Sequence, residues 1–392
     1  WCQETLGVLP NELIWSKSVD DGFTWIDPQP VPMPLPGAAE VPAPLCVTRT
    51  GRWLAPYAPH NTFDPDLKVD LKHIVLMLSD DEGKTWSIPK VIPDLKRARQ
   101  KDGYEVCAGD LWPTYHARSG KVIATGKTFN FEGGTKENRR REKVSYAVMN
   151  PADGSWSPLR FLEMPEKDHR GHAITAANAG NTQRVDLPNG EILLPVRYMA
   201  DPKKFNYTSV VVRRRFDGER ISYVEHGTEL NIPKGRGLYE PSLIQHGEWF
   251  YLTLRADHSG YMTRSRDGLV FEQVREWTFD DGEPLGSYNT QQHWVTVGGG
   301  LFLVYTRRGA GNDHMFRHRA PLFIARVHPG TLRVIRETER VLIPENQATL
   351  GNSGICRISD QESWVTCGEG LLRMGKRKGQ RNKVLFVRIL AR

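Results

Sequence analysis

The sequence of 392 residues lacks long apolar runs. No stretch approaches the roughly 18 consecutive apolar residues that mark a transmembrane helix, so we expect no membrane insertion. The composition, 39% hydrophobic and 25% charged, is typical of a globular chain. The first residue is Trp1 rather than Met, and we expect a secreted or periplasmic protein whose signal peptide has been removed.

Long blocks of like charge are also missing. The formal net charge is +7, but the densest basic stretches, 138–141 and 376–378, are short and have no interleaved aromatic residues. We therefore expect no nucleic-acid partner. A mild positive balance instead suits an anionic small substrate.

Cysteines are few, and none has the C-x-x-C spacing of a zinc site, so we expect no metal and no cofactor. Cys356 and Cys367 flank a turn, ISDQ, in a region that reads as a hairpin, which would place them opposite each other. A disulfide and two buried thiols both remain open.

Helix signals are nearly absent, whereas short strand signals such as EILLPVRY and EWFYLTLR recur between Gly, Asn, Asp and Pro. Strands that open a group recur at intervals of about 50 to 75 residues, near Leu45, Val106, Thr182, Pro241, Trp294 and Ile355. This period predicts an all-β fold, a six-bladed β-propeller of four-stranded antiparallel blades, with seven blades as the alternative. We expect one domain over 1–392, in which the N-terminal strands close the last blade.

A pattern of eight residues, S-x-D-x-G-x-T-W, occurs twice, at 18–25 and 79–86, and weaker echoes occur at 153–156 and 265–271. The Asp carboxylate is expected to cap backbone N–H groups of a turn, while Gly adopts a conformation that other residues resist. The pattern resembles the Asp box, or BNR repeat, of the sialidase-type β-propellers. That resemblance places these turns between outer strands, away from the active centre.

Glu240 and Arg255 are the sharpest candidate pair. They stand 15 residues apart on a predicted hairpin, so both side chains can reach the same end of a central channel. They resemble the sialidase glutamate and one of the three arginines that bind the substrate carboxylate. Arg197 and Arg307 end equivalent strands, with Arg308 as the alternative to Arg307, and the resemblance implies a cationic mouth.

Further candidates lie where neighbouring blades begin. Asp110 falls where sialidases have an acidic residue, and His60 stands near the position expected for the acid/base aspartate. We assign Glu240, Asp110 and His60 to catalysis. Together with the three arginines, the predicted substrate-binding residues are His116, His172, His293, Tyr288, His318 and Asn352.

One feature departs from the family. The segment LGNSGIC places Asn352 where sialidases have their tyrosine nucleophile, and an amide cannot form the same covalent intermediate. Tyr288 and Tyr239 are the alternative tyrosines.

Three functions follow from these residues: an exo-acting glycoside hydrolase that releases a terminal acidic or deoxy sugar, a polysaccharide lyase acting on uronic-acid glycans, and a carbohydrate-binding propeller without catalysis. The sequence does not indicate an oligomeric state.

Overall fold

We analysed a computed structural model of the chain, which describes residues 97–132, 135–136, 141–370 and 383–391, together with short segments before residue 97. Those segments are 14–15, 29–30, 46–47, 53–57, 62–64, 69–71, 75–81, 84–87, 90–91 and 95. Strands dominate this part of the chain, and the short 3-10 helices η2 (Phe316–His318) and η3 (Arg336–Thr338) lie in loops between strands of its fourth blade. Within the described ranges, no helix has the length and apolarity needed to cross a membrane.

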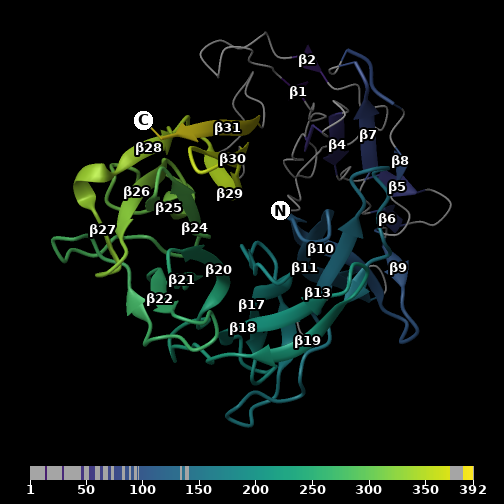
Figure 1. The fold of residues 1–392 in the computed structure, drawn as a ribbon, viewed down its shortest axis with the longest axis horizontal. Helices are drawn as coiled ribbons and strands as arrows, with labels where there is room; N and C mark the ends of the chain where they lie inside the picture. Colours follow the sequence, from purple (N-terminus) through teal and green to yellow (C-terminus); the bar gives the residue numbers. More distant parts are fainter. Residues whose placement is uncertain are drawn as a thin grey trace.

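Five antiparallel sheets follow one another around a ring, coloured from blue through teal and green to yellow in Figure 1. The first blade consists of β9 (Ala98–Arg99), β10 (Glu105–His116), β11 (Lys121–Glu132), β12 (Thr135–Lys136), β13 (Val144–Met149) and β14 (Arg160–Phe161). The second blade consists of β15 (Thr175–Asn178), β16 (Val185–Asp186), β17 (Glu191–Met199), β18 (Tyr207–Phe216) and β19 (Ile221–His226). The third has β20 (Tyr239–His246), β21 (Trp249–Arg255), β22 (Tyr261–Ser265) and β23 (Arg275–Glu276). The fourth blade contains β24 (His293–Val297), β25 (Gly300–Tyr305), β26 (Leu322–His328), β27 (Arg333–Val334) and β28 (Arg340–Ile343). The fifth blade contains β29 (Thr349–Arg357), β30 (Glu362–Gly370) and β31 (Lys383–Leu390).

The N-terminal quarter adds short strands. β3 (Cys46–Val47), β4 (Trp53–Tyr57), β7 (Val75–Ser79) and β8 (Lys90–Val91) form one sheet, while β1 (Ile14–Trp15) pairs with β2 (Gln29–Pro30) and β5 (Thr62–Asp64) with β6 (Val69–Leu71). The all-β propeller is confirmed, but the structure shows five blades in its described part, so the predicted count of six or seven is wrong there. The opener near Leu45 belongs to the N-terminal region, which is described only in short pieces. Closure of the last blade by the N-terminus stays a prediction.

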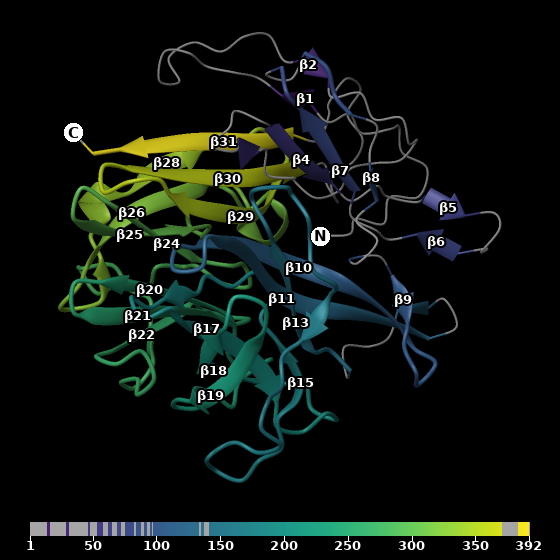
Figure 2. The same cartoon turned by 45° about the vertical axis from the view of Figure 1, so that its right-hand side comes forward.

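The core lies between neighbouring sheets. Every residue of β13 and of β17 is buried. Ile123 and Tyr146 of the first blade share one apolar cluster with Leu194 and Val196 of the second. Toward the centre of the ring, β20 contacts both β17 and β24, and β24 contacts β29, as Figures 1 and 2 show. This stacking brings the inner strands of successive blades together at the axis.

The Asp-box turns have the predicted geometry where they are described. Asp81 Oδ1 accepts from the Thr85 N–H at 2.8 Å, and its Oδ2 accepts from the Thr85 hydroxyl at 2.5 Å. These hydrogen bonds lower the pKa of Asp81 to about 2. Asp267 accepts from the N–H groups of Leu269 and Val270 at 2.8 and 2.7 Å. The first copy, at 18–25, lies outside the described residues.

Cys356 and Cys367 are free thiols, and Cys356 is exposed whereas Cys367 is buried. The β29–β30 register pairs Cys356 with Trp364 and Cys367 with Ser353. The expectation that the two cysteines lie opposite each other is therefore wrong, because the hairpin turns about 358–362 and sets them in different rungs of the ladder.

Candidate functional site

An unusual backbone feature recurs in or just before an inner strand of each of the first four blades. Asp110, Ala176, Glu240 and Asn289 have positive φ values of 48°, 48°, 47° and 48°. Such values are uncommon for residues other than glycine. Three of these residues lie at register shifts, in β10, β15 and β20, and strand irregularities of this kind re-aim side chains. The repetition in successive blades marks one end of the ring as a built site.

Six charged side chains from the first three blades meet at this end. Arg255 donates to Glu240 at 2.5 Å, and Arg197 lies 3.8 Å from Glu240 and 3.9 Å from Glu142. Lys127 contacts Asp110 at 2.7 Å and Glu142 at 3.8 Å. None of these side chains is more than 14% exposed. We call this group the charged mouth: Asp110, Lys127, Glu142, Arg197, Glu240 and Arg255.

The cations of the charged mouth hold Glu240 and Asp110 ionised. Burial favours the neutral form of Glu240, but the charges of Arg255 and Arg197 outweigh it and lower the pKa to about 2. For Asp110 burial acts in the same direction, and the charge of Lys127 helps bring its pKa well below the usual range. Both groups are therefore anions at neutral pH. Neither is prepared to give up a proton as a general acid in this arrangement.

Asn289, which lies between β23 and β24, extends the charged mouth toward the fourth blade. Its Oδ1 accepts from Arg255 and from Arg236, each at 2.8 Å. Arg236 pairs with Asp257 at 2.6 Å, and the Tyr239 hydroxyl donates to the same carboxylate at 2.7 Å. Tyr239 is fully buried, and burial is the main reason why its pKa rises to about 12. This environment suits a residue that positions arginines.

A third arginine approaches the charged mouth, and it is Arg319. Arg319 is almost fully buried, and burial lowers its pKa to about 9, with the nearby charge of Arg255 acting in the same direction and Glu240 against it. Its carbonyl accepts from the Leu350 N–H at 2.7 Å, which anchors it to β29. The guanidinium of Arg319 thus lies within electrostatic range of both members of the Glu240–Arg255 pair.

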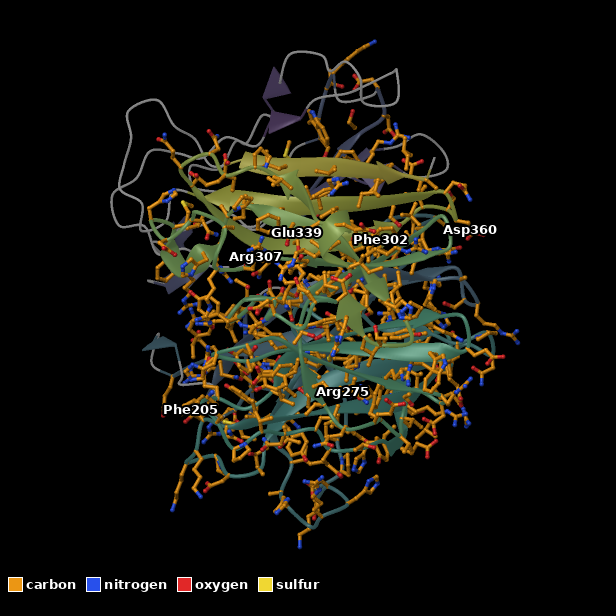
Figure 3. The ribbon with its side chains drawn as sticks, turned by 90° about the vertical axis from the view of Figure 1, so that its left-hand side faces the viewer. Phe205, Arg275, Phe302, Arg307, Glu339 and Asp360 are labelled. Atoms are coloured by element: carbon orange, nitrogen blue, oxygen red, sulfur yellow. The ribbon has the colours of Figure 1, made fainter. Side chains whose placement is uncertain are left out.

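Arg307, the predicted third arginine, lies elsewhere. It donates to Glu339 from Nε at 2.8 Å and from Nη2 at 2.6 Å, and the two residues lie near each other on the side of the ring shown in Figure 3. Arg308, the alternative candidate, donates to the His258 carbonyl at 2.8 Å and stacks on Tyr288. The contacts described for Arg307 and Arg308 do not join either one to Glu240.

Two further predicted residues form a chain beside Asn289. The Tyr288 hydroxyl is hydrogen-bonded to His318 Nδ1 at 2.5 Å, and His318 Nε2 lies 3.1 Å from Asp313 Oδ1. The Arg308 guanidinium lies 4.1 Å from the centre of the Tyr288 ring. A phenol, an imidazole and a carboxylate in series can move a proton. We call this group the Tyr288 relay.

The remaining predicted residues fall into different places. His293 is fully buried, is hydrogen-bonded to Ser242 at 2.9 Å, and has a pKa lowered to about 3 by burial. Asn352 lies at the register shift of β29. His116 is the last residue of β10, six positions after Asp110, and is hydrogen-bonded to Ser119 and to the Gly190 carbonyl, whereas His172 is exposed beside Asp168. His60 lies outside the described residues.

Three members of this region were not among the predicted site residues. Lys127 stands inside an apolar strand, KVIATGK, and a lysine in such a strand is a usable signal, because buried lysines are rare. Glu142 and Arg319 lie in the polar stretches RREKV and FRHRAP, where nothing sets them apart from exposed neighbours. A cavity of about 410 Å³ adjoins Glu142 and is also lined by Tyr104, Asn130 and Ala176.

Comparison with known proteins gives structures but no sequence family. No family model matches the chain, and no curated protein matches it. A protein of unknown function from Dyadobacter fermentans is 14% identical with a TM-score of 0.58, over 88% of this chain and 93% of that one. Trypanosoma rangeli sialidase in complex with sialic acid is 13% identical with a TM-score of 0.57, over 97% of this chain and 57% of that one. NanB sialidase from Streptococcus pneumoniae is 12% identical with a TM-score of 0.52, over 83% and 64%.

The chain has the sialidase-type β-propeller fold. The solved sialidases are longer, and the chain spans between about half and two thirds of their length. The assignment of Asn352 to the position of the sialidase tyrosine nucleophile stays a prediction from the sequence. The fold therefore agrees with the expectation from the Asp boxes, and the chemistry has to be argued from the charged mouth.

Proposed function

We propose that this sialidase-like propeller is an exo-acting glycoside hydrolase that releases a terminal acidic sugar from a glycan. The observation that carries the proposal is the convergence of Arg197 and Arg255 on Glu240, with Arg319 close by. Guanidinium groups bind carboxylates through paired N–H donors, so a cluster of three is suited to an anionic sugar. Sialic acid, an acidic sugar, is bound in one of the similar sialidase structures.

Unused donors support this assignment. The Nε–H groups of Arg197 and Arg255 are buried and have no hydrogen-bond acceptor among the described residues. A buried donor without an acceptor costs about 1–3 kcal/mol. A ligand carboxylate would supply the missing acceptors, and the cost would be recovered on binding.

Glu240 and Asp110 are the carboxylates of the charged mouth that would act on the substrate as anions. Glu240 is the candidate group that stabilises positive charge developing on the sugar ring, while Asp110 is the second carboxylate. Because both are ionised, the leaving group needs a proton from another residue. The Tyr288 relay and His60 are the candidates for that acid.

A polysaccharide lyase is the second candidate, and the Tyr288 relay is the observation that favours it. β-Elimination from a uronic acid requires neutralisation of the carboxylate, a base and a proton donor, but no covalent nucleophile. The arginines would meet the first requirement, and tyrosine with histidine would meet the others. The substitution of asparagine for the sialidase tyrosine agrees with this chemistry and also with a propeller that binds sugar without cleaving it.

A panel of acidic oligosaccharides separates these functions. A hydrolase releases reducing ends without new ultraviolet absorbance, a lyase adds the absorbance of a carbon–carbon double bond, and a binding protein retains the sugar and releases nothing. We expect release without absorbance, and loss of that release in Glu240→Gln. Glu339→Gln is the matched control, because Glu339 also pairs with a poorly exposed arginine but outside the charged mouth. Full activity of Glu240→Gln, or neither binding nor release of any acidic sugar, would refute the proposal.

A further inference from the structure

A second cluster of titratable side chains lies in the second blade and shares no residue with the charged mouth. It consists of His169, in the loop before β15, His226, the last residue of β19, and Glu229, three residues later. We call it the histidine cluster. One potential ligand atom from each of the three residues lies within 4.8 Å of the others. The loop before β15 and the outermost strand of the blade thus meet through these side chains.

One carboxylate oxygen is the focus of the cluster. Glu229 Oε1 lies 3.4 Å from His169 Nδ1 and 3.6 Å from His226 Nε2, and it accepts from the His169 N–H at 2.8 Å. The two imidazole rings stack with centroids 3.9 Å apart and an angle of 11° between their planes. This is a compact set of two nitrogens and one carboxylate.

His226 provides an independent indication of a ligand. Its side chain is 5% exposed, and its Nε2 has no hydrogen-bond partner among the described residues. Its Nδ1 is hydrogen-bonded to the Tyr223 hydroxyl at 2.7 Å. In the tautomer that carries its proton on Nδ1, the His226 Nε2 lone pair faces the Glu229 carboxylate at 3.6 Å. Two electron-rich groups so placed repel each other unless a cation lies between them.

We propose that His169, His226 and Glu229 form a zinc-binding site. Two imidazoles and one carboxylate are a known zinc ligand set, which leaves the fourth position to water or to an outside ligand. The nitrogen ligands favour a transition metal over calcium or magnesium. The Tyr223 contact supplies the outer-shell hydrogen bond that metal-ligating histidines normally make.

The surroundings allow the small movement that binding requires. Parallel stacked rings cannot both direct an in-plane lone pair at one ion, so one ring has to turn. His169 is 60% exposed and is free to do so, whereas buried His226 keeps its place. Arg170 lies 3.8 Å from Glu229 Oε2 and is also largely exposed, so its guanidinium can withdraw when a cation arrives.

Nearby Asp168 adds negative potential without competing for the ion. Its Oδ2 accepts from the Tyr198 hydroxyl at 2.6 Å, and its Oδ1 accepts from the N–H groups of Arg170 and His172. The carboxylate is thereby engaged by the loop 168–172 itself. A zinc ion bound beside it would clamp that loop to β19 and stabilise the second blade by mass action.

The test is a titration of the untagged, metal-free chain of 392 residues with Co²⁺, followed by visible absorption, and with Zn²⁺, followed by calorimetry. We expect one equivalent to bind, a visible band of a low-coordinate cobalt site, and a zinc-dependent rise in Tm. Affinity should fall about tenfold or more in His169→Gln and in His226→Gln. His172→Gln is the matched control, because this neighbouring histidine is equally exposed and lies outside the cluster.

His169→Gln decides the outcome even if His226→Gln folds poorly, because His169 lies on the surface. Equal affinity of the His169→Gln and His172→Gln variants would overturn the proposal. Absence of saturable binding to the unaltered chain would overturn it as well. Neither result depends on whether the charged mouth acts on sugars.

Discussion

At the scale of single residues, the site was predictable where a local pattern fixes the geometry. Glu240 and Arg255 could be paired from sequence because they flank one tight hairpin, and the register places Tyr239 directly opposite Arg255. Arg319 could not be found in this way. The loop between β25 and β26 separates it from the strand end on which the spacing argument relied, and its burial depends on β29, which is contributed by the next blade.

We expect substitutions of Arg319 and of Arg307 to have different effects on sugar binding. Arg319→Lys should weaken binding of a carboxylate-bearing monosaccharide by about tenfold, roughly 1.4 kcal/mol, because lysine keeps the charge but loses the planar fork. Arg307→Lys should change affinity by less than about twofold, because Glu339 already engages Arg307 through two hydrogen bonds. Calorimetric titration of both variants with the acidic sugar and with a neutral sugar of the same size measures the difference. If Arg307→Lys weakened binding more than Arg319→Lys, Arg307 and not Arg319 would be the third carboxylate-binding arginine.

At the scale of elements, the Asp-box turns were predictable and the strand bulges were not. A box is specified by residues within one turn, so Asp81 and Asp267 form the expected hydrogen bonds. The positive-φ positions are occupied by Asp110, Ala176, Glu240 and Asn289, which share no side-chain property. What they share is their place where inner strands of adjacent blades meet, and that is a tertiary constraint with no local signature.

The Asp-box turns should contribute to stability and not to sugar binding. Asp267→Ala removes the acceptor for the Leu269 and Val270 N–H groups and should lower the free energy of unfolding by about 1–2 kcal/mol, as loss of a side-chain cap does. Urea unfolding measures this change. Glu248→Ala is the control, because its exposed pair with Arg266 should be worth less than about 1 kcal/mol. An Asp267→Ala chain of unaltered stability but weakened sugar affinity would place this turn in the binding site instead.

At the scale of the whole molecule, the charged mouth joins three blades through buried ion pairs. The pairs run from Asp110 in β10 through Lys127, Glu142 and Arg197 to Glu240 in β20. The apolar repeat could be predicted from sequence, since each blade needs a similar strand pattern, but a network that crosses blades has no period. Its members lie up to 145 positions apart, from Asp110 to Arg255. Only the packing of the first three blades against one another brings them together.

This network predicts how stability depends on pH. The pKa of Glu240 is lowered in the folded state from 4.5 to about 2, so folding favours its ionised form. A carboxylate with a lowered folded-state pKa contributes stability that is complete above its unfolded pKa and is lost as pH falls toward the folded value. Asp110 shifts in the same direction. Stability should therefore stay level down to about pH 5 and then fall steeply toward about pH 2.

Glu240→Gln separates the contribution of this one carboxylate from general acid unfolding. The variant should be less stable near pH 7, by about 3–5 kcal/mol, because Arg255 and Arg197 keep their buried charges without a counterion. Its stability should fall less between pH 5 and pH 2, since the group that takes up the proton is gone. Urea midpoints measured across this range test both effects. If the plots of stability against pH for the variant and the unaltered chain run parallel, the arginines do not lower the pKa of Glu240 in the folded protein. The charge balance inferred for the charged mouth would then be wrong.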